Sequence, residues 1–564
     1  MEHRGFEFES SDWSPEQLWE DFDPAADDLQ IKTLDTFERD GVLVRELTYV
    51  SHSCDDEPIV AYGFLAVPEG GEELPGVLHI HGGGQTASVD HVVHWAKRGY
   101  AALTFDWTGP RDDRERFSQF GGASDNKYLV EPDPYHSHLF HGTAIARRGL
   151  TLLEQVPEVD GERLGIYGIS WGGFLSWLVN GSDSRVKAGV AIYGSGGTLK
   201  WGNGTGPDYD PDDEDQRTWN FCFNPFVYAE LLHGPMLLLN STNDFFGWMD
   251  TAEELYTILP PQHSLCFCPH FNHHLDEFTS RNLYAWIDKH LKGGAPWPGQ
   301  VLVEVEQGQQ LTIEIRPDRT DEIEHVELFH SVQQQPSPSR FWCPVPVEKN
   351  EKDWTSSIEP PLPELKHTIY ATVHYSRGIS VSSIPITLMP NEHGVNEDEA
   401  AYSLVIDDFS GGLGGWFLQG LGTEPFPELL KLATTEGPSG GPALTIEPVA
   451  VEGDEFNWNI ATRKIGDPRW AAKGCESLLL LLKAVCTSPL SIRLTYRPDM
   501  NDTEAFTVEI DEPDQGWAEL ELNPKRFKGP GNEELESFDG FGLLEILSKS
   551  PVNEPPVVAR VEWF

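Results

Sequence analysis

The residues best suited to chemistry are a serine flanked by glycines and, further along the chain, an aspartate and a group of histidines. Ser170 stands in the pattern Gly168-x-Ser170-x-Gly172, between a short apolar run at 163–167 and a helical pattern that begins at Trp171. In this strand–turn–helix context, small neighbours leave room for a serine at a strained turn, and the helix N-terminus favours negative charge beside it. The pattern predicts that Ser170 is a nucleophile.

A serine nucleophile needs a base, an acid that orients the base, and donors for the oxyanion. Asp244 follows a predicted strand at 236–240, so it lies on a loop at the carboxyl end of that strand, where the acid belongs. The alternative for Asp244 is a helix N-cap, a position that also favours aspartate. Asp250 is the second choice for the acid, although it falls inside a predicted helix.

The base is expected in the run 269–274, which follows a predicted strand at 264–268. His273 is the favoured base because it lies just before the last helix of this region. His274 is the second choice and His270 the third. A metal site made of these histidines would need a carboxylate partner and a tetrahedral arrangement that the spacing does not supply, so no metal is predicted.

A glycine run provides the expected oxyanion hole. The run from Gly82 to Gly84 follows a predicted strand at 76–80, and glycines let the backbone come close to a tetrahedral oxyanion. The amides of Gly83 and Gly84, together with that of Trp171, are the predicted donors.

Tryptophans near these strand ends are candidates for binding the substrate. Trp107 follows a predicted strand at 100–106, and Trp201 lies in a long insert at 194–232 that also holds Trp219. Both Trp107 and Trp201 are predicted to contact substrate. The alternative for the tryptophans of the insert is ordinary packing.

Strands and helices alternate through this part of the chain, which predicts a doubly wound, mostly parallel sheet. A capping pattern starts a first helix at Ser14. The other predicted helices are 89–98, 139–155, 171–179, 249–259 and 275–291, and the predicted strands are 41–50, 59–67, 76–80, 100–106, 163–167, 186–193, 236–240 and 264–268.

Three stretches, 81–87, 98–102 and 159–173, resemble the acetyl xylan esterase and cephalosporin deacetylase-like branch of the dienelactone-hydrolase and prolyl-oligopeptidase clan. The resemblance implies an α/β-hydrolase fold for residues 1–294. It also implies Ser170 as nucleophile, Asp244 as acid and a histidine of the 269–274 loop as base. Consecutive histidines in that loop depart from the pattern of the family, so the choice between His273 and its neighbour stays open.

Two further domains are predicted from alternating apolar runs. Residues 297–392 are expected to form an Ig- or fibronectin-like β-sandwich. Residues 400–564 are expected to form a jelly-roll-like β-sandwich, similar to the galactose-binding-like sandwiches that often bind carbohydrate. Because the linker near Pro390 is polar, few contacts are expected to cross it, and the last domain should be separable.

The composition narrows the class of partner. The 564 residues include 91 Asp and Glu against 40 Lys and Arg, a formal net charge of −51, which disfavours nucleic acid and anionic membranes as partners. The chain has no apolar stretch long enough for a membrane span, and its start has no apolar signal core. As written, the sequence predicts a cytoplasmic protein, or a secreted one if a signal has been removed.

Together these patterns predict a serine carboxylic-ester hydrolase that removes acetyl or other short acyl groups, acting without a cofactor on a small-molecule or polysaccharide ester. A peptidase or amidase of the same clan is the first alternative, because it would use the same three residues. A non-catalytic carbohydrate-binding protein is the second. The sequence does not predict the oligomeric state.

Overall fold

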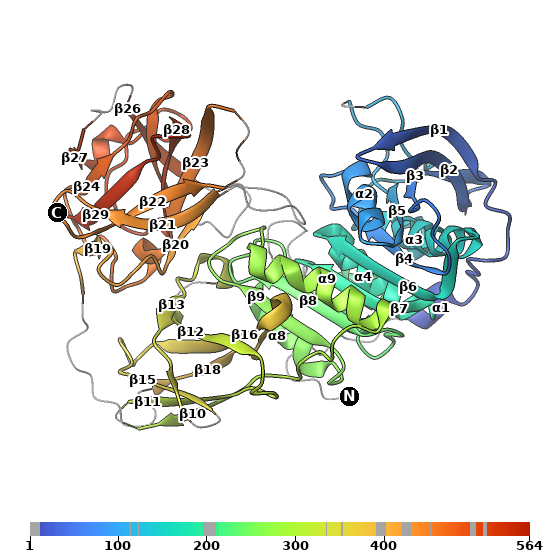
Figure 1. Cartoon of the computed structure of the whole chain (residues 1–564), viewed down its shortest axis with the longest axis horizontal. Helices are drawn as coiled ribbons and strands as arrows, with labels where there is room; N and C mark the ends of the chain where they lie inside the picture. Colours follow the sequence, from blue (N-terminus) through green and yellow to red (C-terminus); the bar gives the residue numbers. More distant parts are fainter. Residues whose placement is uncertain are drawn as a thin grey trace.

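The computed structural model describes one α/β part followed by two β-rich parts, which Figure 1 shows in blue to green, in yellow and in orange to red. The described residues are 12–112, 114–121, 123–195, 210, 212–308, 310–333, 336–350, 353–390, 402–419, 430–449, 451, 453–496, 504–510 and 516–564. Among them, no helix is both long and apolar enough to cross a membrane.

A nine-stranded sheet forms the centre of the α/β part, with the strand order β1-β2-β3-β5-β4-β6-β7-β8-β9. The strands from β1 to β5 in this order pair antiparallel, and those from β5 to β9 pair parallel. The mostly parallel sheet is therefore confirmed. The strands are β1 Lys32–Arg39, β2 Val42–Cys54, β3 Glu57–Ala66, β4 Leu74–Ile80, β5 Ala101–Asp106, β6 Val159–Ile169, β7 Val186–Ile192, β8 Met236–Ser241 and β9 Ser264–Cys268.

Helices cover both faces of this sheet. One apolar core lies beneath α2 Val89–Lys97 and α9 Glu277–Lys292, and another lies beneath α3 His138–Gln155 and α4 Trp171–Ser182. Burial of both faces explains why the parallel strands read as continuous apolar runs. The remaining α-helices described in this part are α1 Pro15–Trp19, α6 Glu214–Phe223, α7 Pro225–Tyr228 and α8 Met249–Ile258.

The ends of these helices follow capping chemistry. The Ser14 hydroxyl accepts the amide of Gln17 at the start of α1, as the capping pattern predicts. The Asp276 carboxylate accepts the amide of Thr279 at 2.7 Å and starts α9, and Gly293 ends that helix in the left-handed region with φ 69°. Strand β1 was not predicted, because its side chains are mostly exposed and carry no apolar pattern.

The order of the strands brings the predicted site together. The chain runs from β4 to β5 on one side, whereas β6, which also pairs with β4, leads to β7 on the other side. Crevices open at such switch points, outside the carboxyl ends of the strands. The glycine run leaves β4 there, and Ser170 leaves β6 beside it.

The β-rich parts each contain two sheets whose apolar faces share one core. This arrangement is consistent with β-sandwiches, while the Ig-like and jelly-roll-like assignments and the domain limits stay predictions. The first part holds β10 Leu302–Gln307, β11 Leu311–Arg316, β12 Ile323–Gln333, β13 Cys343–Val345, β14 Glu348–Lys349, β15 Trp354–Ile358, β16 Lys366–Tyr375, β17 Ile379–Ser382 and β18 Ile386–Leu388. The second holds β19 Val405–Asp407, β20 Trp416–Leu418, β21 Leu430–Glu436, β22 Pro442–Pro448, β23 Glu455–Thr462, β24 Leu478–Lys483, β25 Leu490–Thr495, β26 Ala505–Ile510, β27 Ala518–Leu522, β28 Leu543–Pro551 and β29 Val557–Trp563.

Candidate active site

Ser170 occupies a strained turn between β6 and α4. Its backbone has φ 58° and ψ −122°, a conformation that residues other than glycine rarely adopt. The flanking glycines are required by contact. A Cβ on Gly168 would lie 2.0 Å from the carbonyl oxygen of Gly172, and a Cβ on Gly172 would lie 2.0 Å from that of Ile80. The glycine spacing therefore serves the close packing of the turn against β4.

Asp244 and His273 meet at the ends of two neighbouring strands, β8 and β9. Asp244 is fully buried, and its Oδ1 accepts the amides of Phe246, at 2.8 Å, and Gly247. The Nδ1 atom of His273 lies 2.6 Å from Oδ2 of Asp244. With the proton on Nδ1 for this hydrogen bond, Nε2 is left as a proton acceptor. The pair thus has the chemistry of a base held by an acid.

The other candidates for acid and base lie in different surroundings. Asp250 makes a bidentate ion pair with Arg340, at 2.8 and 3.0 Å. His270 is buried, and its pKa is lowered to about 3 by burial and by the charge of Arg463. His274 lines the same cavity as His273, but the Asp244 contact described above is made by His273.

A cavity of about 410 Å³ opens at the strand ends. It is lined by Ser170, His273 and the glycine run 82–84, and Trp171 and Phe246 form part of its apolar wall. The indole of Trp171 lies 4.9 Å from the ring of Phe246, measured between centroids. The sequence-predicted nucleophile, base and oxyanion donors therefore surround one space, with Asp244 behind the base.

The three glycines of the run 82–84 differ in what surrounds them. The amide of Gly82 already donates to Oε1 of Gln85 at 2.9 Å. A Cβ on Gly83 would lie 2.6 Å from Cδ1 of Trp171, so only glycine fits there. A Cβ on Gly84 would meet nothing within 4 Å. Gly83 thus packs directly against the indole of Trp171, the residue whose backbone amide is another of the predicted donors.

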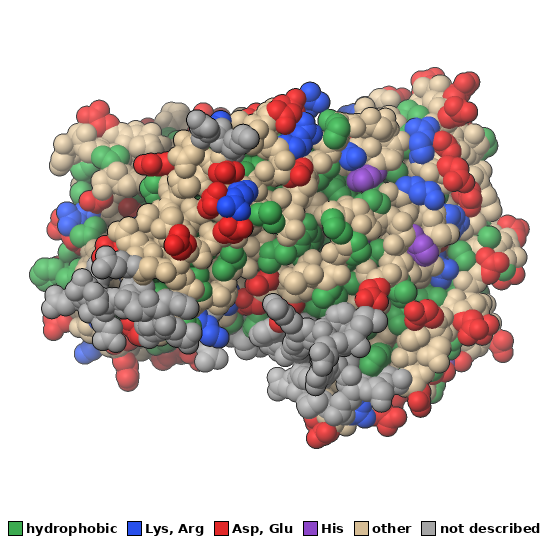
Figure 2. Space-filling view, turned by 90° about the horizontal axis from the view of Figure 1, so that it is seen from below, with side chains coloured by type: hydrophobic (Ala, Val, Ile, Leu, Met, Phe, Trp, Pro, Cys, Tyr) green, Lys and Arg blue, Asp and Glu red, His purple; other side chains and the backbone are tan. Residues whose placement is uncertain are grey.

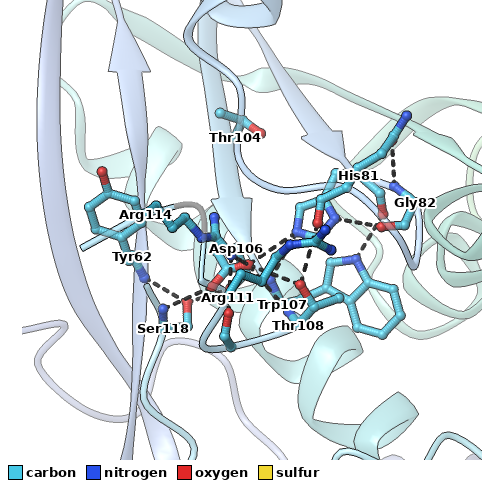
Figure 3. Close-up of polar contacts among 12 residues, drawn as sticks. Tyr62, His81, Gly82, Thr104, Asp106, Trp107, Thr108, Arg111, Arg114 and Ser118 are labelled. Atoms are coloured by element: carbon cyan, nitrogen blue, oxygen red, sulfur yellow. Dashed lines mark hydrogen bonds and ion pairs between the residues drawn. The ribbon is translucent and has the colours of Figure 1, made fainter. Parts of the chain in front are cut away.

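A buried polar network supports the glycine run from behind, and Figure 3 shows its members converging on Asp106. The Nδ1 atom of His81 donates to the carbonyl of Gly82 at 2.7 Å, and its Nε2 lies 3.4 Å from Asp106, which also pairs with Arg114 at 2.9 Å. Burial alone would raise the pKa of Asp106, but its contacts with His81 and Arg114 outweigh burial and lower that pKa to about 2. Sequence reasoning missed this network, although an Asp at a strand end was a signal for it.

Trp107 belongs to this network rather than to the cavity wall. Its side chain is fully buried, its indole donates to the carbonyl of His81 at 2.8 Å, and it is not among the residues that line the cavity. Trp219 is also buried, in α6. Trp201 lies outside the described residues, so its predicted contact with substrate stays a prediction.

The loops that carry the acid and the base are also bound by the β-rich parts. The side-chain nitrogen Nδ2 of Asn243 donates to three carbonyls of the 337–340 turn, including that of Arg340 at 2.7 Å. From the last part, the buried Arg463 donates to the carbonyls of His270 and Pro338. The expectation that few contacts cross to the last part is wrong, because Arg463, far from the linker, binds the loop at 269–274 and the 337–340 turn.

Two groups of side chains in the described part of the chain have donors that suit a metal ion: Cys54, Asp55 and His136, and His325, Glu327 and His374. Neither group includes a residue that lines the cavity. The chemistry of the cavity itself is that of a serine, a histidine and an aspartate.

Fold and site together define an α/β-hydrolase. Residues 12–195 match the sequence model of the acetyl xylan esterase (AXE1) family, and residues 215–337 match that of the PhoPQ-activated pathogenicity-related proteins. The first match includes Ser170 and the glycine run, and the second includes Asp244 and His273. The N-terminal part of the chain is therefore acetyl xylan esterase-like.

Curated relatives include both esterases and peptidases. The chain is 30% identical over 138 residues to acetyl esterase Axe7A of Xylanibacter ruminicola, covering 23% of this chain and 31% of that protein. It is 23% identical over 269 residues to the uncharacterized peptidase YuxL of Bacillus subtilis, covering 42% of this chain and 38% of that protein. The chain thus spans less than half the length of these relatives.

Among solved structures, the acetyl xylan esterase from Paenibacillus sp. R4 is 20% identical with a TM-score of 0.41, covering 48% of this chain and 91% of that chain. Acetyl xylan esterase 1 from Thermoanaerobacterium sp. is 17% identical with a TM-score of 0.40, covering 46% of this chain and 88% of that chain.

Proposed function

We propose that this protein is a serine carboxylic-ester hydrolase that removes acetyl and other short acyl groups, with Ser170 as nucleophile, His273 as base and Asp244 as the acid that orients it. One observation carries the proposal: a serine in a strained elbow and a histidine line the same cavity, and that histidine is bound at 2.6 Å to a buried aspartate. The match to the acetyl xylan esterase family supports an ester as substrate.

In the proposed reaction, Oγ of Ser170 attacks the ester carbonyl while Nε2 of His273 takes its proton. The carbonyl oxygen becomes an oxyanion, which the amides of Gly83 and Trp171 stabilise, with that of Gly84 as a further donor. Collapse of this intermediate breaks the ester bond, and His273 returns the proton to the leaving alcohol. A water molecule, activated by His273, then hydrolyses the acyl-serine and releases the acid.

The dimensions of the cavity support a short acyl group. Its volume of about 410 Å³ has to hold both the acyl group and part of the alcohol, and the Trp171 indole stands directly beside the nucleophile. A saccharide is the proposed alcohol, on the basis of the family match and of the relatives named as acetyl esterases.

The test is labelling by a fluorophosphonate probe, followed by turnover of a panel of substrates. Wild type should be labelled and should hydrolyse 4-nitrophenyl acetate faster than the octanoate in kcat/KM. Ser170→Ala should lose both activities, whereas Ser182→Ala, at the far end of the helix that follows Ser170, should keep them. Equal labelling of wild type and Ser170→Ala would remove Ser170 from the mechanism.

A peptidase is the second candidate, because YuxL and dipeptidyl-peptidase 5 of Porphyromonas gingivalis are among the relatives. Peptide 4-nitroanilides in the same panel separate the two functions. Faster cleavage of the anilides than of acetyl esters would favour the peptidase. Failure of wild type to react with the probe or any substrate would leave the non-catalytic alternative.

A further inference from the structure

Besides two histidines, the described residues that line the cavity include one lysine, Lys127, and no arginine. Its ammonium nitrogen lies 5.8 Å from the ring centroid of Trp171 and 5.5 Å from that of Trp107. The lysine therefore stands at the wall of the cavity next to the residue that follows the nucleophile.

The loop that carries Lys127 is held firmly. The indole of the buried Trp219 donates to the carbonyl of Lys127 at 2.8 Å. The next residue, Tyr128, packs between Trp171 and Trp219, with centroid distances of 5.8 and 5.5 Å. Helix α6 thus fixes the backbone from which the lysine reaches the cavity, and its position does not depend on a substrate.

In the described part of the chain, no carboxylate is bound to the charge of Lys127. Among the described residues its ammonium group makes no hydrogen bond or ion pair, whereas Lys464 and Lys549 each pair with a carboxylate. Burial lowers the pKa of Lys127, an effect that the more distant Asp125 partly offsets. Two indole faces offer this half-buried cation only a weak attraction, so an anionic ligand would relieve the cost of its burial.

The rest of the protein makes this cation unusual. The chain carries a net charge of −51, and on the face shown in Figure 2 acidic side chains spread along the rim with basic ones between them. Salt screens surface charges beyond about 10 Å, so a substrate inside the cavity is governed by the charges that line it. A lysine in the wall of the same cavity as Ser170 therefore influences which charge on a substrate is favoured.

We propose that Lys127 binds a carboxylate on the substrate, so that the enzyme prefers esters that carry a negative charge close to the scissile bond. This inference rests on the proposed esterase function and adds the substrate class. The carboxylate can belong to the acyl part, as in a half-ester of a dicarboxylic acid, or to the alcohol part, as in an acetylated acidic sugar. Both sources present the same chemistry to the lysine.

Two pairs of esters test the inference and separate the sources. For the acyl part, 4-nitrophenyl hemisuccinate is compared with its neutral isostere, 4-nitrophenyl 4-methylpentanoate. For the alcohol part, 4-acetoxybenzoate is compared with 4-acetoxybenzamide. The measured quantity is the ratio of kcat/KM for the anionic and the neutral ester of each pair, in wild type and in Lys127→Met.

The ratio should fall by about tenfold to one hundredfold in Lys127→Met for the pair whose carboxylate reaches the lysine, which is the effect of losing one hydrogen bond to a charged group. Lys127→Arg should keep most of the preference and Lys127→Glu should reverse it. Because each ratio is compared with that of wild type, differences in leaving-group reactivity cancel.

An uncharged probe serves as the control for an intact site. The rate at which a neutral fluorophosphonate labels Lys127→Met should equal the rate for wild type, because the probe carries no carboxylate for the lysine to bind. Unchanged ratios in both pairs, with neutral esters still hydrolysed, would overturn the role of Lys127 and leave the esterase proposal standing. Absence of turnover of all four esters by wild type would overturn the esterase proposal and this inference with it.

Discussion

The contact between Arg463 and the loop of the proposed base gives the sharpest test of how this site is held. Arg463 is 1% exposed, and it donates to the carbonyls of His270 and Pro338 and stacks over Phe417, at 4.8 Å from the ring centroid. His270 is three positions before His273. Replacing the guanidinium in Arg463→Met removes the tether of this loop and keeps an apolar stem in its place.

Two opposing effects set the expected magnitude. Each hydrogen bond from a charged donor contributes about 1.5–3 kcal/mol, so two of them contribute about 3–6 kcal/mol. Burial, however, lowers the pKa of Arg463 to about 9, so a cost of burying this charge opposes the hydrogen bonds. The free energy of unfolding should therefore change by no more than about 2 kcal/mol, as for other buried charges replaced by apolar residues. The loop of the base loses its support all the same.

We expect kcat for 4-nitrophenyl acetate to fall by about one hundredfold, because a displacement of about 1 Å in a catalytic group has an effect of this size. KM should change little, since Arg463 lies outside the cavity wall. Arg463→Lys keeps the charge but cannot donate in two directions as a guanidinium does, so its kcat should lie between those of wild type and Arg463→Met. Wild-type kcat in a folded Arg463→Met protein would refute the reasoning, and so would a loss of activity that only follows a collapse in Tm.

Three further predictions use the same ester assay, and a fourth uses thermal unfolding. His273→Ala should lose several orders of magnitude in kcat and His274→Ala far less, because only the former accepts the proton; the reverse result would move the base by one residue. Gly83→Ala should lower kcat by about 10²–10³ because its Cβ meets Trp171 at 2.6 Å, whereas Gly84→Ala, with open space around it, should stay close to wild type. Asp106→Asn should lower Tm most above about pH 5, and the deficit should shrink as pH falls toward and below about 2, because a carboxyl whose pKa is lowered to about 2 stabilises the fold above its unfolded pKa and loses that effect as pH falls through the folded value; a deficit in Tm that does not vary with pH would contradict this. A chain that ends at residue 390 should lose most of its turnover through the missing contacts to the 269–274 loop, and full activity would show that the last part is separable after all.

Local sequence patterns predicted much of the fold. The alternation of apolar strands and helices predicted the mostly parallel sheet, and the capping pattern at Ser14 marked the start of the first helix where the structure has it. These features depend on residues close in sequence and on burial of both faces of the sheet. Strand β1 has neither signal, since it is an exposed edge whose formation depends on pairing with β2.

The proposed site divides in the same way. The glycines around Ser170 mark a turn whose geometry is local, so the nucleophile can be named without a structure. The choice among the histidines at 270–274 cannot be made without a structure, because it depends on which ring reaches Asp244 at the end of the neighbouring strand. The structure brings His273 within 2.6 Å of that carboxylate and puts His270 in an aromatic pocket against the last part of the chain.

The sequence by itself determined the sheet, the strained elbow and the set of candidate acids and bases, because each depends on the spacing of residues that are close in the chain. Only the tertiary structure decided that Trp107 supports the glycine run from behind, that Lys127 stands at the cavity wall, and that Arg463 reaches the loop of the base. These contacts join residues separated by tens to hundreds of positions, for which no local pattern exists. The polar linker near Pro390 shows only where the chain passes from one part to the next. The contacts between the parts depend on the surfaces that pack together after folding.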